Sequence, residues 1–224
     1  MPANTAVAKK SKEALPAHLK STPMGNESAE TIQSIPYLKL LADISPELKE
    51  RNEKFIPNAK EGYFVNSVTK EVYGPSVEVV CCYTRSSFKV WTKFEHGGGF
   101  MGSFKTEVEA QQFANAQPEP AKLEIKDTDD HALLINGQPV LFSVHGAKLW
   151  NSRSWNKVLG ETGLSRWAKP WLLEAELQTS KSSGKDYWRF KVPTEQPKYV
   201  SEEIAEAAEA LYLAQKARET ETTQ

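Results

Sequence analysis

Tryptophan and basic residues are concentrated in residues 147–171, "AKLWNSRSWNKVLGETGLSRWAKPW". This stretch holds four of the six tryptophans of the chain, together with five lysine and arginine residues. Indole rings stack on nucleobases, and lysine and arginine attract phosphates, so the mixture is typical of proteins that bind single-stranded nucleic acid. The same residue types also form buried cores with a basic rim and anchors in protein interfaces, and both alternatives stay open.

Two strand-like segments repeat this mixture, "YTRSSFKVWTKF" (83–94) and "KDYWRFK" (185–191). Because side chains alternate along a strand, Lys89, Trp91 and Lys93 share one face. Burying two unpaired ammonium groups would cost more free energy than burying the indole returns, so we expect this face to be open to solvent. Trp188 either stacks on a base or belongs to the core.

A helix over residues 146–159 would place Trp150, Arg153 and Lys157 on one side and Trp155 on another. Trp150 is therefore predicted as a second base platform beside two phosphate contacts. In the alternative, Trp150 caps the end of a barrel and the basic stems pack over its ring. The predicted nucleic-acid-binding residues are Tyr83, Arg85, Lys89, Trp91, Lys93, Lys148, Trp150, Arg153, Lys157, Trp188 and Arg189.

The sequence gives only weak evidence for a catalytic site. Asp127, Asp129, Asp130 and His131 resemble a divalent-metal nuclease cluster only faintly, and we interpret them as a polar turn between strands. The glycines at 97–99 are not followed directly by a helix, as a phosphate-binding loop requires, so they indicate a hairpin tip. The adjacent cysteines at 81 and 82 show no metal-ligand spacing with the histidines. We expect no enzymatic activity, no cofactor and no metal.

Charge is distributed unevenly along the chain, although the formal net charge is only −1. Residues 140–192 contain nine basic and four acidic side chains, whereas residues 201–224 contain two basic and six acidic ones. A basic body with an acidic end fits a polyanion-binding protein whose tail competes for the same surface.

The elements that must position these residues follow from the pattern along the chain. Residues 1–34 are predicted as a disordered arm because they hold few large apolar side chains. A short helix is expected before Pro46, strands from residue 61, and a helix capped by Thr106 and Glu109. A hairpin around Asn136-Gly137, the helix over 146–159, a hairpin over 171–192 and a helix over 201–217 then follow.

This order places a helix before the last two strands, as in an oligonucleotide-binding (OB) fold. We predict a mixed α+β protein, an OB-fold-like Greek-key barrel with an inserted helix and a C-terminal helix. The order of elements is also compatible with a β-sandwich or another α+β arrangement. The expected division is an arm (1–34), an OB-like nucleic-acid-binding domain (35–192), and an acidic helix and tail (193–224).

The segments "FVNSVTKEVYG" and "VLFSVHGAKLWNSRSWNKVL" resemble a group of small bacteriophage-encoded single-stranded DNA-binding proteins, over about residues 57–192. The resemblance implies an OB fold, no catalysis, and contacts with replication or recombination proteins through the C-terminal region. The end of the chain, "ARETETTQ", departs from the acidic tails with a terminal hydrophobic residue that the best-known members carry.

The predicted function is therefore non-sequence-specific binding of single-stranded DNA, or of RNA, in phage replication and recombination. The alternative is a phage virion or host-takeover module that uses the same aromatic residues as protein contacts. No apolar run long enough to span a membrane and no secretion signal is present, so we expect a cytoplasmic protein without a membrane partner. The C-terminal helix is expected to serve a homodimer or regulation.

Overall fold

The computed structural model describes residues 36–181 and 184–221, which belong to one compact unit. The expected arm, residues 1–34, lies outside the described residues. The strands are β1 (Leu38–Leu40), β2 (Phe64–Asn66), β3 (Val72–Gly74), β4 (Ser76–Thr92), β5 (Phe100–Phe104), β6 (Leu123–Ile135), β7 (Gln138–His145), β8 (Trp171–Thr179), β9 (Asp186–Phe190) and β10 (Thr194–Glu195). The helices are α1 (Glu107–Asn115), α2 (Leu149–Glu161) and α3 (Glu202–Glu221). Short 3-10 turns lie at Pro46–Leu48, Phe94–His96, Pro120–Lys122 and Gly146–Lys148.

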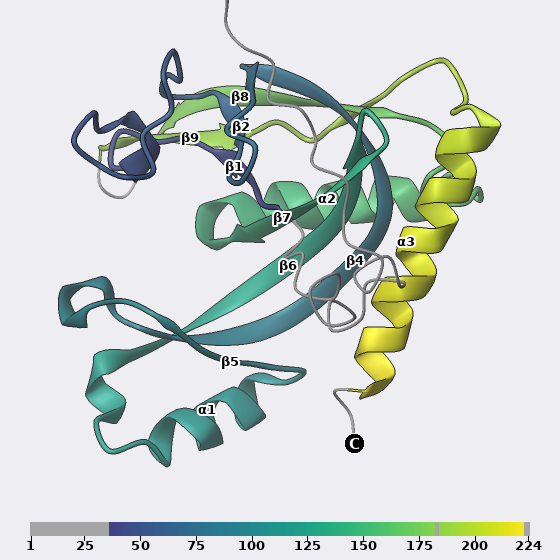
Figure 1. The fold of residues 1–224 in the computed structure, drawn as a ribbon. Helices are drawn as coiled ribbons and strands as arrows, with labels where there is room; N and C mark the ends of the chain where they lie inside the picture. The colour runs from purple at the N-terminus through teal and green to yellow at the C-terminus, as the bar shows by residue number, and fades with distance from the viewer. Residues whose placement is uncertain (1–35, 182–183, 222–224) are drawn as a thin grey trace, which may run out of the picture. The chain divides into compact units, whose positions relative to one another are not determined.

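Strand β4 connects most of the sheet, as its curved path shows in Figure 1. Its first residues, 76–79, pair with β8, and residues 80–92 pair with β6. Near its end it also pairs with β5. The main sheet has seven strands in the order β10-β8-β4-β6-β7, with β5 on β4 and β9 on β8, and a second sheet has the order β1-β2-β3.

The predicted mixed α+β class is confirmed, with antiparallel sheets, but the strands do not form a closed barrel. Within the described residues, no ladder joins β7 to β9, the pairing that would close the main sheet. The physical reason is β1, which contacts both of these strands. Tyr37 forms an isolated bridge with Leu141, whose backbone N–H donates to the Pro36 carbonyl. A short extra strand thus takes the place where the two edges would otherwise meet.

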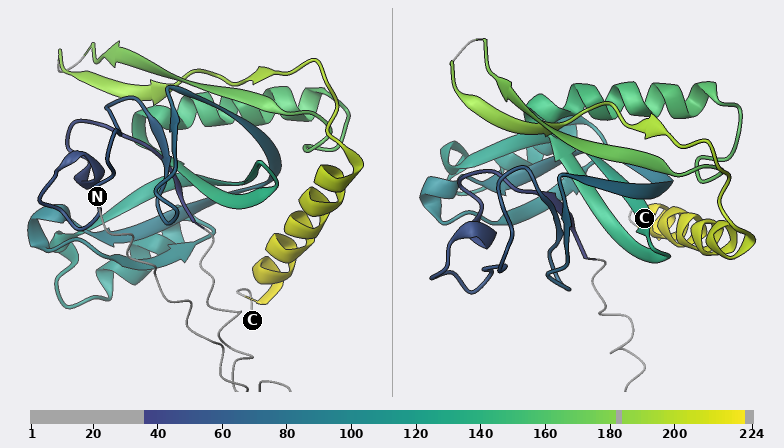
Figure 2. Two further views of the ribbon diagram at one scale, coloured as in Figure 1. Left: turned by 45° about the horizontal axis from the view of Figure 1, so that its top comes forward. Right: turned by 90° about the horizontal axis from the view of Figure 1, so that it is seen from above.

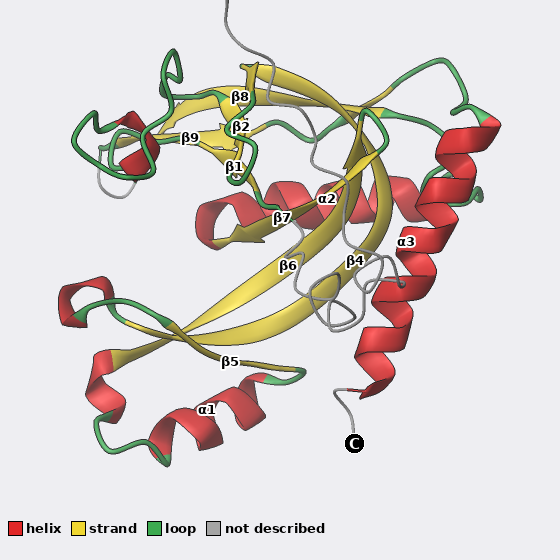
Figure 3. Ribbon diagram, viewed as in Figure 1, coloured by secondary structure: helices red, strands yellow, loops and turns green. Residues whose placement is uncertain are grey.

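Three of the four predicted helices are present, and their patterns explain their positions (Figure 3). Helix α1 begins with the expected capping box between Thr106 and Glu109. Helix α2 buries Trp155 and Leu159 against the main core, as the helical spacing predicted. Figure 2 shows α2 and α3 as separate helices at the margins of the sheet. The hairpin at Asn136-Gly137 is also confirmed, since both residues have positive φ and connect β6 to β7.

Two local predictions are wrong. The helix expected before Pro46 is strand β1, because Leu38 and Leu40 alternate toward the core and only a 3-10 turn begins at Pro46. The segment interpreted as a polar turn, which contains Asp129 and His131, lies inside β6. Its polar side chains fit a strand because the inward-pointing ones have hydrogen-bond partners of their own, described below.

Candidate nucleic-acid interface

The sheet formed by β4, β6 and β7 has two faces of different character. In the antiparallel register, Lys89 lies opposite Lys126, and Ser86 lies opposite Asp129. Residues directly opposite each other point to the same face, and neighbours along a strand point to opposite faces. Lys89 and Lys126 therefore share the outer face, whereas Ser86 and Asp129 share the inner face, which α2 covers.

A cavity of about 680 Å³ lies against the outer face. Its other wall is the segment that contains β1 and the turn at Pro46. This volume is within the range of small-ligand sites, about 300 to 1,000 Å³. The basic and aromatic side chains that line it are Lys39, Lys54, Lys89, Lys126, Lys148, His145, Trp91, Tyr37 and Phe142. Among the lining residues, all of which are described, Glu47 is the one carboxylate.

Three of the five lining lysines have acidic partners. Lys39 pairs with Glu47, the Lys89 ammonium lies 2.7 Å from a carboxylate oxygen of Asp130, and Lys126 lies 2.7 Å from Glu124. The ammonium groups of Lys54 and Lys148 have no hydrogen-bond or ion-pair partner within residues 36–181 and 184–221. The cavity therefore contains positive charge that the protein does not neutralise.

Electrostatics in the cavity disfavour further positive charge. Burial lowers the pKa of the Lys148 ammonium. Burial, followed by the positive charges of Lys126, Lys148 and Lys89, also lowers the pKa of His145. The Lys148 shift has the sign expected for an amine partly removed from water, and the His145 shift has the sign expected for an imidazole that is also close to cations. A bound anion would reverse them, which makes the site suited to a negatively charged ligand.

Two aromatic side chains stand among these cations. Trp91 is half-buried, and its ring contacts Phe100 edge-on, with centroids 5.2 Å apart. Tyr37 is 44% exposed and lies beside Lys39 in the cavity wall. An aromatic face beside unpaired ammonium groups can hold a base and its phosphate together.

The structure brings only part of the predicted residue set to this cavity: Lys89, Trp91 and Lys148. Lys93, expected beside Trp91, instead donates to the Ala121 carbonyl at 2.7 Å. Tyr83 and Arg85 contact α3, as described below.

The predicted residues on β9 take structural positions. Trp188 packs against the main core, over the backbone of Gly62. A Cβ added at Gly62 would lie 2.5 Å from the indole ring, so the close approach requires glycine. Arg189 pairs with Glu176 of β8 at 2.8 Å. Both side chains thus have partners that explain them without a ligand.

The predicted residues on α2 are not in the cavity. Trp150 is 66% exposed and is not among the lining residues. Arg153 pairs with Asp127, which directly follows Lys126 on β6 and therefore points to the opposite face. Lys157 lies 3.8 Å from Glu161 on its own helix. The structure does not join the α2 residues to Lys89 and Trp91 in one groove.

Several cavity residues were missed from the sequence: Tyr37, Lys39, Lys54, Lys126 and His145. Lys126 had a signal, because it alternates with the apolar Leu123 and Ile125 in "AKLEIKD" and so points away from the core. The other residues reach the cavity through long-range packing of β1 and β7, which no local pattern announces.

The inner face carries a buried polar network. His131 bonds through Nδ1 to Thr84 and through Nε2 to Ser152, at 2.8 and 2.7 Å. Asp129 accepts hydrogen bonds from Ser152 and Ser86, both at 2.6 Å. Burial, assisted by the nearby Arg166 charge, lowers the pKa of His131 to about 3, so the imidazole is neutral. His131, Asp129 and Ser152 are fully buried, which denies a substrate access to them.

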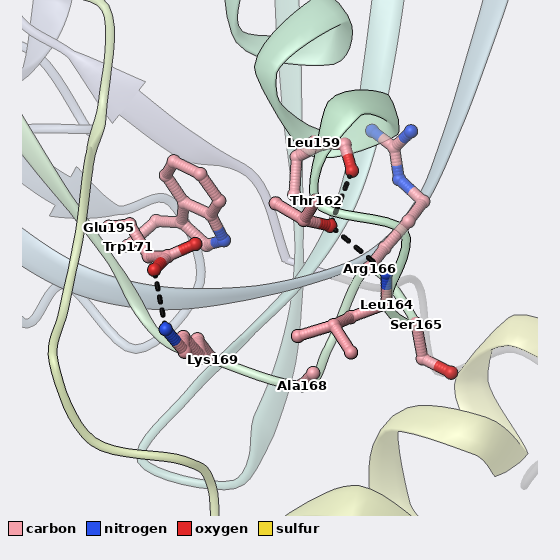
Figure 4. A pocket seen from close by; sticks show the side chains of 9 residues that line it. All are labelled: Leu159, Thr162, Leu164, Ser165, Arg166, Ala168, Lys169, Trp171 and Glu195. Carbon is pink, nitrogen blue, oxygen red and sulfur yellow. Dashed lines mark hydrogen bonds and ion pairs between the residues drawn. The ribbon is translucent and has the colours of Figure 1, made fainter.

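Two other features of the described residues offer no reactive site. In the part of the chain that the structure describes, no group of three or more His, Cys, Asp or Glu side chains could hold a metal ion. The pocket in Figure 4, beside the Lys169–Glu195 ion pair, has a volume of about 10 Å³. This is room for about one water molecule, too little for a ligand.

The protein is thus a mixed α+β protein, and its candidate site is a cavity lined by basic and aromatic side chains. The chain belongs to the family described as Pam3 phage gp34-like protein, whose model matches residues 9–221. The name of this family is that of a bacteriophage protein. Searches of curated proteins and of solved structures give no match. Of the helices in the described ranges, none is long and apolar enough to cross a membrane.

Proposed function

We propose that this protein binds single-stranded DNA without sequence specificity, with the strand entering the cavity on the outer face of β4, β6 and β7. One observation carries the proposal: Trp91 lines the same cavity as Lys54 and Lys148, whose ammonium groups have no protein partner among the described residues. Lys148 is half-buried, whereas Lys54 is exposed at the mouth of the cavity. Burying the Lys148 ammonium without a counterion is unfavourable, and a phosphate would relieve the cost.

The strand order supports an OB-like arrangement. One long strand, β4, pairs with both β6 and β8, and α2 lies between β7 and β8. In OB folds the second and third strands form the surface that binds oligonucleotides. In this arrangement those strands correspond to β6 and β7, which contribute Lys126 and His145 to the cavity.

The lining predicts how the strand is held. A base would stack on Trp91, which is worth about 1 to 3 kcal/mol in such proteins. Lys54 and Lys148 would contact phosphates, and Lys89 and Lys126 could add contacts by exchanging their present carboxylate partners. Stacking and phosphate contacts are available to every base, so the proposal includes no sequence preference.

The test is a titration of tryptophan fluorescence with oligo(dT) at low and high salt. We expect quenching at low salt and a steep loss of affinity as salt rises, because phosphate binding releases counterions. Trp91→Ala should weaken binding by about tenfold or more, the loss of one stacked base. The matched control, Trp150→Ala, removes an indole outside the cavity and should change little.

Circular dichroism of both variants separates lost binding from lost folding. Absence of quenching at low salt would remove the proposal. Titration with oligo(U) under the same conditions decides between DNA and RNA as the preferred strand.

A protein-contact role is favoured by one different observation. Trp150, Val158 and Leu164 are exposed on or beside α2, away from the cavity lining. Exposed tryptophan is enriched in interface hot spots. Binding that depends on Trp150 and persists at high salt would support this second function.

A further inference from the structure

The outer face of β4 continues beyond the cavity. Tyr83 and Arg85 alternate in step with Lys89 and Trp91, and Arg85 lies opposite Asp130, a neighbour of the cavity on β6. All four side chains therefore lie along one face of a single strand. Of these four, Lys89 and Trp91 line the cavity, and the other two do not.

Helix α3 covers Tyr83 and Arg85. The Tyr212 ring meets the Tyr83 ring edge-on, with centroids 5.9 Å apart. The Glu219 carboxylate lies 3.9 Å from Nε of Arg85. It also accepts a hydrogen bond from the Tyr83 hydroxyl, whose pKa is raised to about 12, mainly by burial, so that the phenol remains a donor. Figure 1 shows α3 passing beside β4.

The groups that α3 presents match those of a nucleotide. Glu219 offers an anion to a guanidinium and a hydroxyl, the donors that also bind phosphate oxygens. Tyr212 places an aromatic ring against Tyr83, where a base could pack once the helix end has moved. The end of α3 thus occupies positions that a phosphate and its base would fill.

The two halves of α3 are attached unequally. The first half packs through Ile204, Ala208 and Leu211 into an apolar cluster with Val80 and Cys82. At the start of the second half, the Tyr212 ring also contacts Trp167, with centroids 5.5 Å apart. Beyond it, Leu213 is exposed, and the ion pair to Arg85 is partly exposed on both sides. Exposed ion pairs contribute little to stability, and helix ends open more easily than their packed parts. The last turns of α3 can therefore detach from β4 while the first half stays packed.

We propose that Tyr83 and Arg85 form a covered extension of the cavity, which binds further nucleotides of the same single strand when the Glu219 end of α3 is displaced. The inference rests on the proposed function and adds to it a second binding segment that α3 controls.

The experiment compares Glu219→Gln with Glu209→Gln in the full chain, over a length series of oligo(dT). Glu209 is exposed on the same helix and gives the same change in charge. We expect Glu219→Gln to tighten binding by about threefold to tenfold, only for oligonucleotides long enough to pass the cavity. Glu209→Gln should stay within about twofold of the wild type, because long-range charge effects are screened.

Two further readouts report on the covered segment itself. Adding Arg85→Ala to Glu219→Gln should cancel the gain in affinity. It should also reduce the slope of affinity against salt concentration by the amount expected for about one phosphate contact. Hydrogen exchange of residues 213–219 should quicken when long oligo(dT) binds the wild-type protein.

The outcomes separate the two claims. If the wild type binds oligo(dT) but Glu219→Gln matches Glu209→Gln at every length, the extension is wrong and the proposed function stands. If none of the proteins binds oligo(dT) at low salt, both are overturned.

Discussion

The two faces of the β4–β6 sheet contain similar polar residues but use them in opposite ways. On the inner face, Asp129 and His131 are fully buried, and each of their polar side-chain atoms has a hydrogen-bond partner. In the cavity against the outer face, Lys148 of the turn Gly146–Lys148 is half-buried, and its ammonium group has no partner in the described ranges. Satisfied buried groups stabilise a fold, whereas an unsatisfied charge in a cavity indicates a missing ligand. The comparison favours a structural role for the inner face and supports the proposed binding at the outer face.

The largest expected effect is on the inner face. Asp129→Ala leaves the buried Ser152 hydroxyl without its acceptor and should lower the free energy of unfolding by about 2 to 4 kcal/mol. Urea denaturation followed by circular dichroism measures this. Glu78→Ala, an exposed position on β4, is the control and should change little. A loss at Asp129 no larger than at Glu78 would contradict a structural role for the network.

A pH dependence of stability should come from the same face. The pKa of His131 falls from 6.5 to about 3 on folding, so the unfolded chain binds the proton more tightly. Its contribution is fully present above pH 6.5 and is lost as pH falls toward 3. By pH 4.5 the loss should be about 2 to 3 kcal/mol.

His131→Gln should flatten this pH dependence, even though it lowers stability at neutral pH. Urea midpoints measured from pH 7 to pH 4.5 provide the comparison. His96→Gln, in an exposed turn, is the control. An unchanged slope in His131→Gln would show that the acid sensitivity has another source.

The sharpest contrast between the faces is expected from Lys148→Met. The change keeps an apolar side chain of similar length but removes the crowded ammonium, so stability should stay equal or rise by up to about 1 kcal/mol. Affinity for oligo(dT) at low salt should fall by about tenfold, with one phosphate contact fewer in the salt dependence.

Lys157→Met is the matched control, since Lys157 is a basic residue on α2 outside the cavity. Thermal unfolding and fluorescence titration measure both quantities on each variant. Equal losses of affinity at positions 148 and 157 would mean that general charge attracts the DNA, and the cavity would lose its assigned role.

The sequence predicted elements better than it predicted the site. The capping box at Thr106 and the turn at Asn136-Gly137 are local signals, and both elements formed as expected. The stripe of Lys89 and Trp91 was found because alternation along a strand is also local. Tyr37 and Lys54 escaped notice because chain packing over long distances brings them to the cavity.

The same limit explains the remaining differences. The polar residues of β6 indicated a turn because their buried partners, such as Ser152, lie on a distant helix. Tyr83 and Arg85 carried the expected residue types, but their cover by α3 depends on a segment more than a hundred residues away. The sequence predicted patterns within one helix or strand, but it did not predict the contacts between these elements.

The long strand β4 also constrains how the protein is made. Its first residues pair with β8, so that Ser76 meets Glu174 only after the intervening chain has been synthesised. Pairing over such separations closes large loops and slows folding. During synthesis on the ribosome, the first residues of β4 therefore stay unpaired until β8 emerges. The part of β4 that pairs with β6 can fold first.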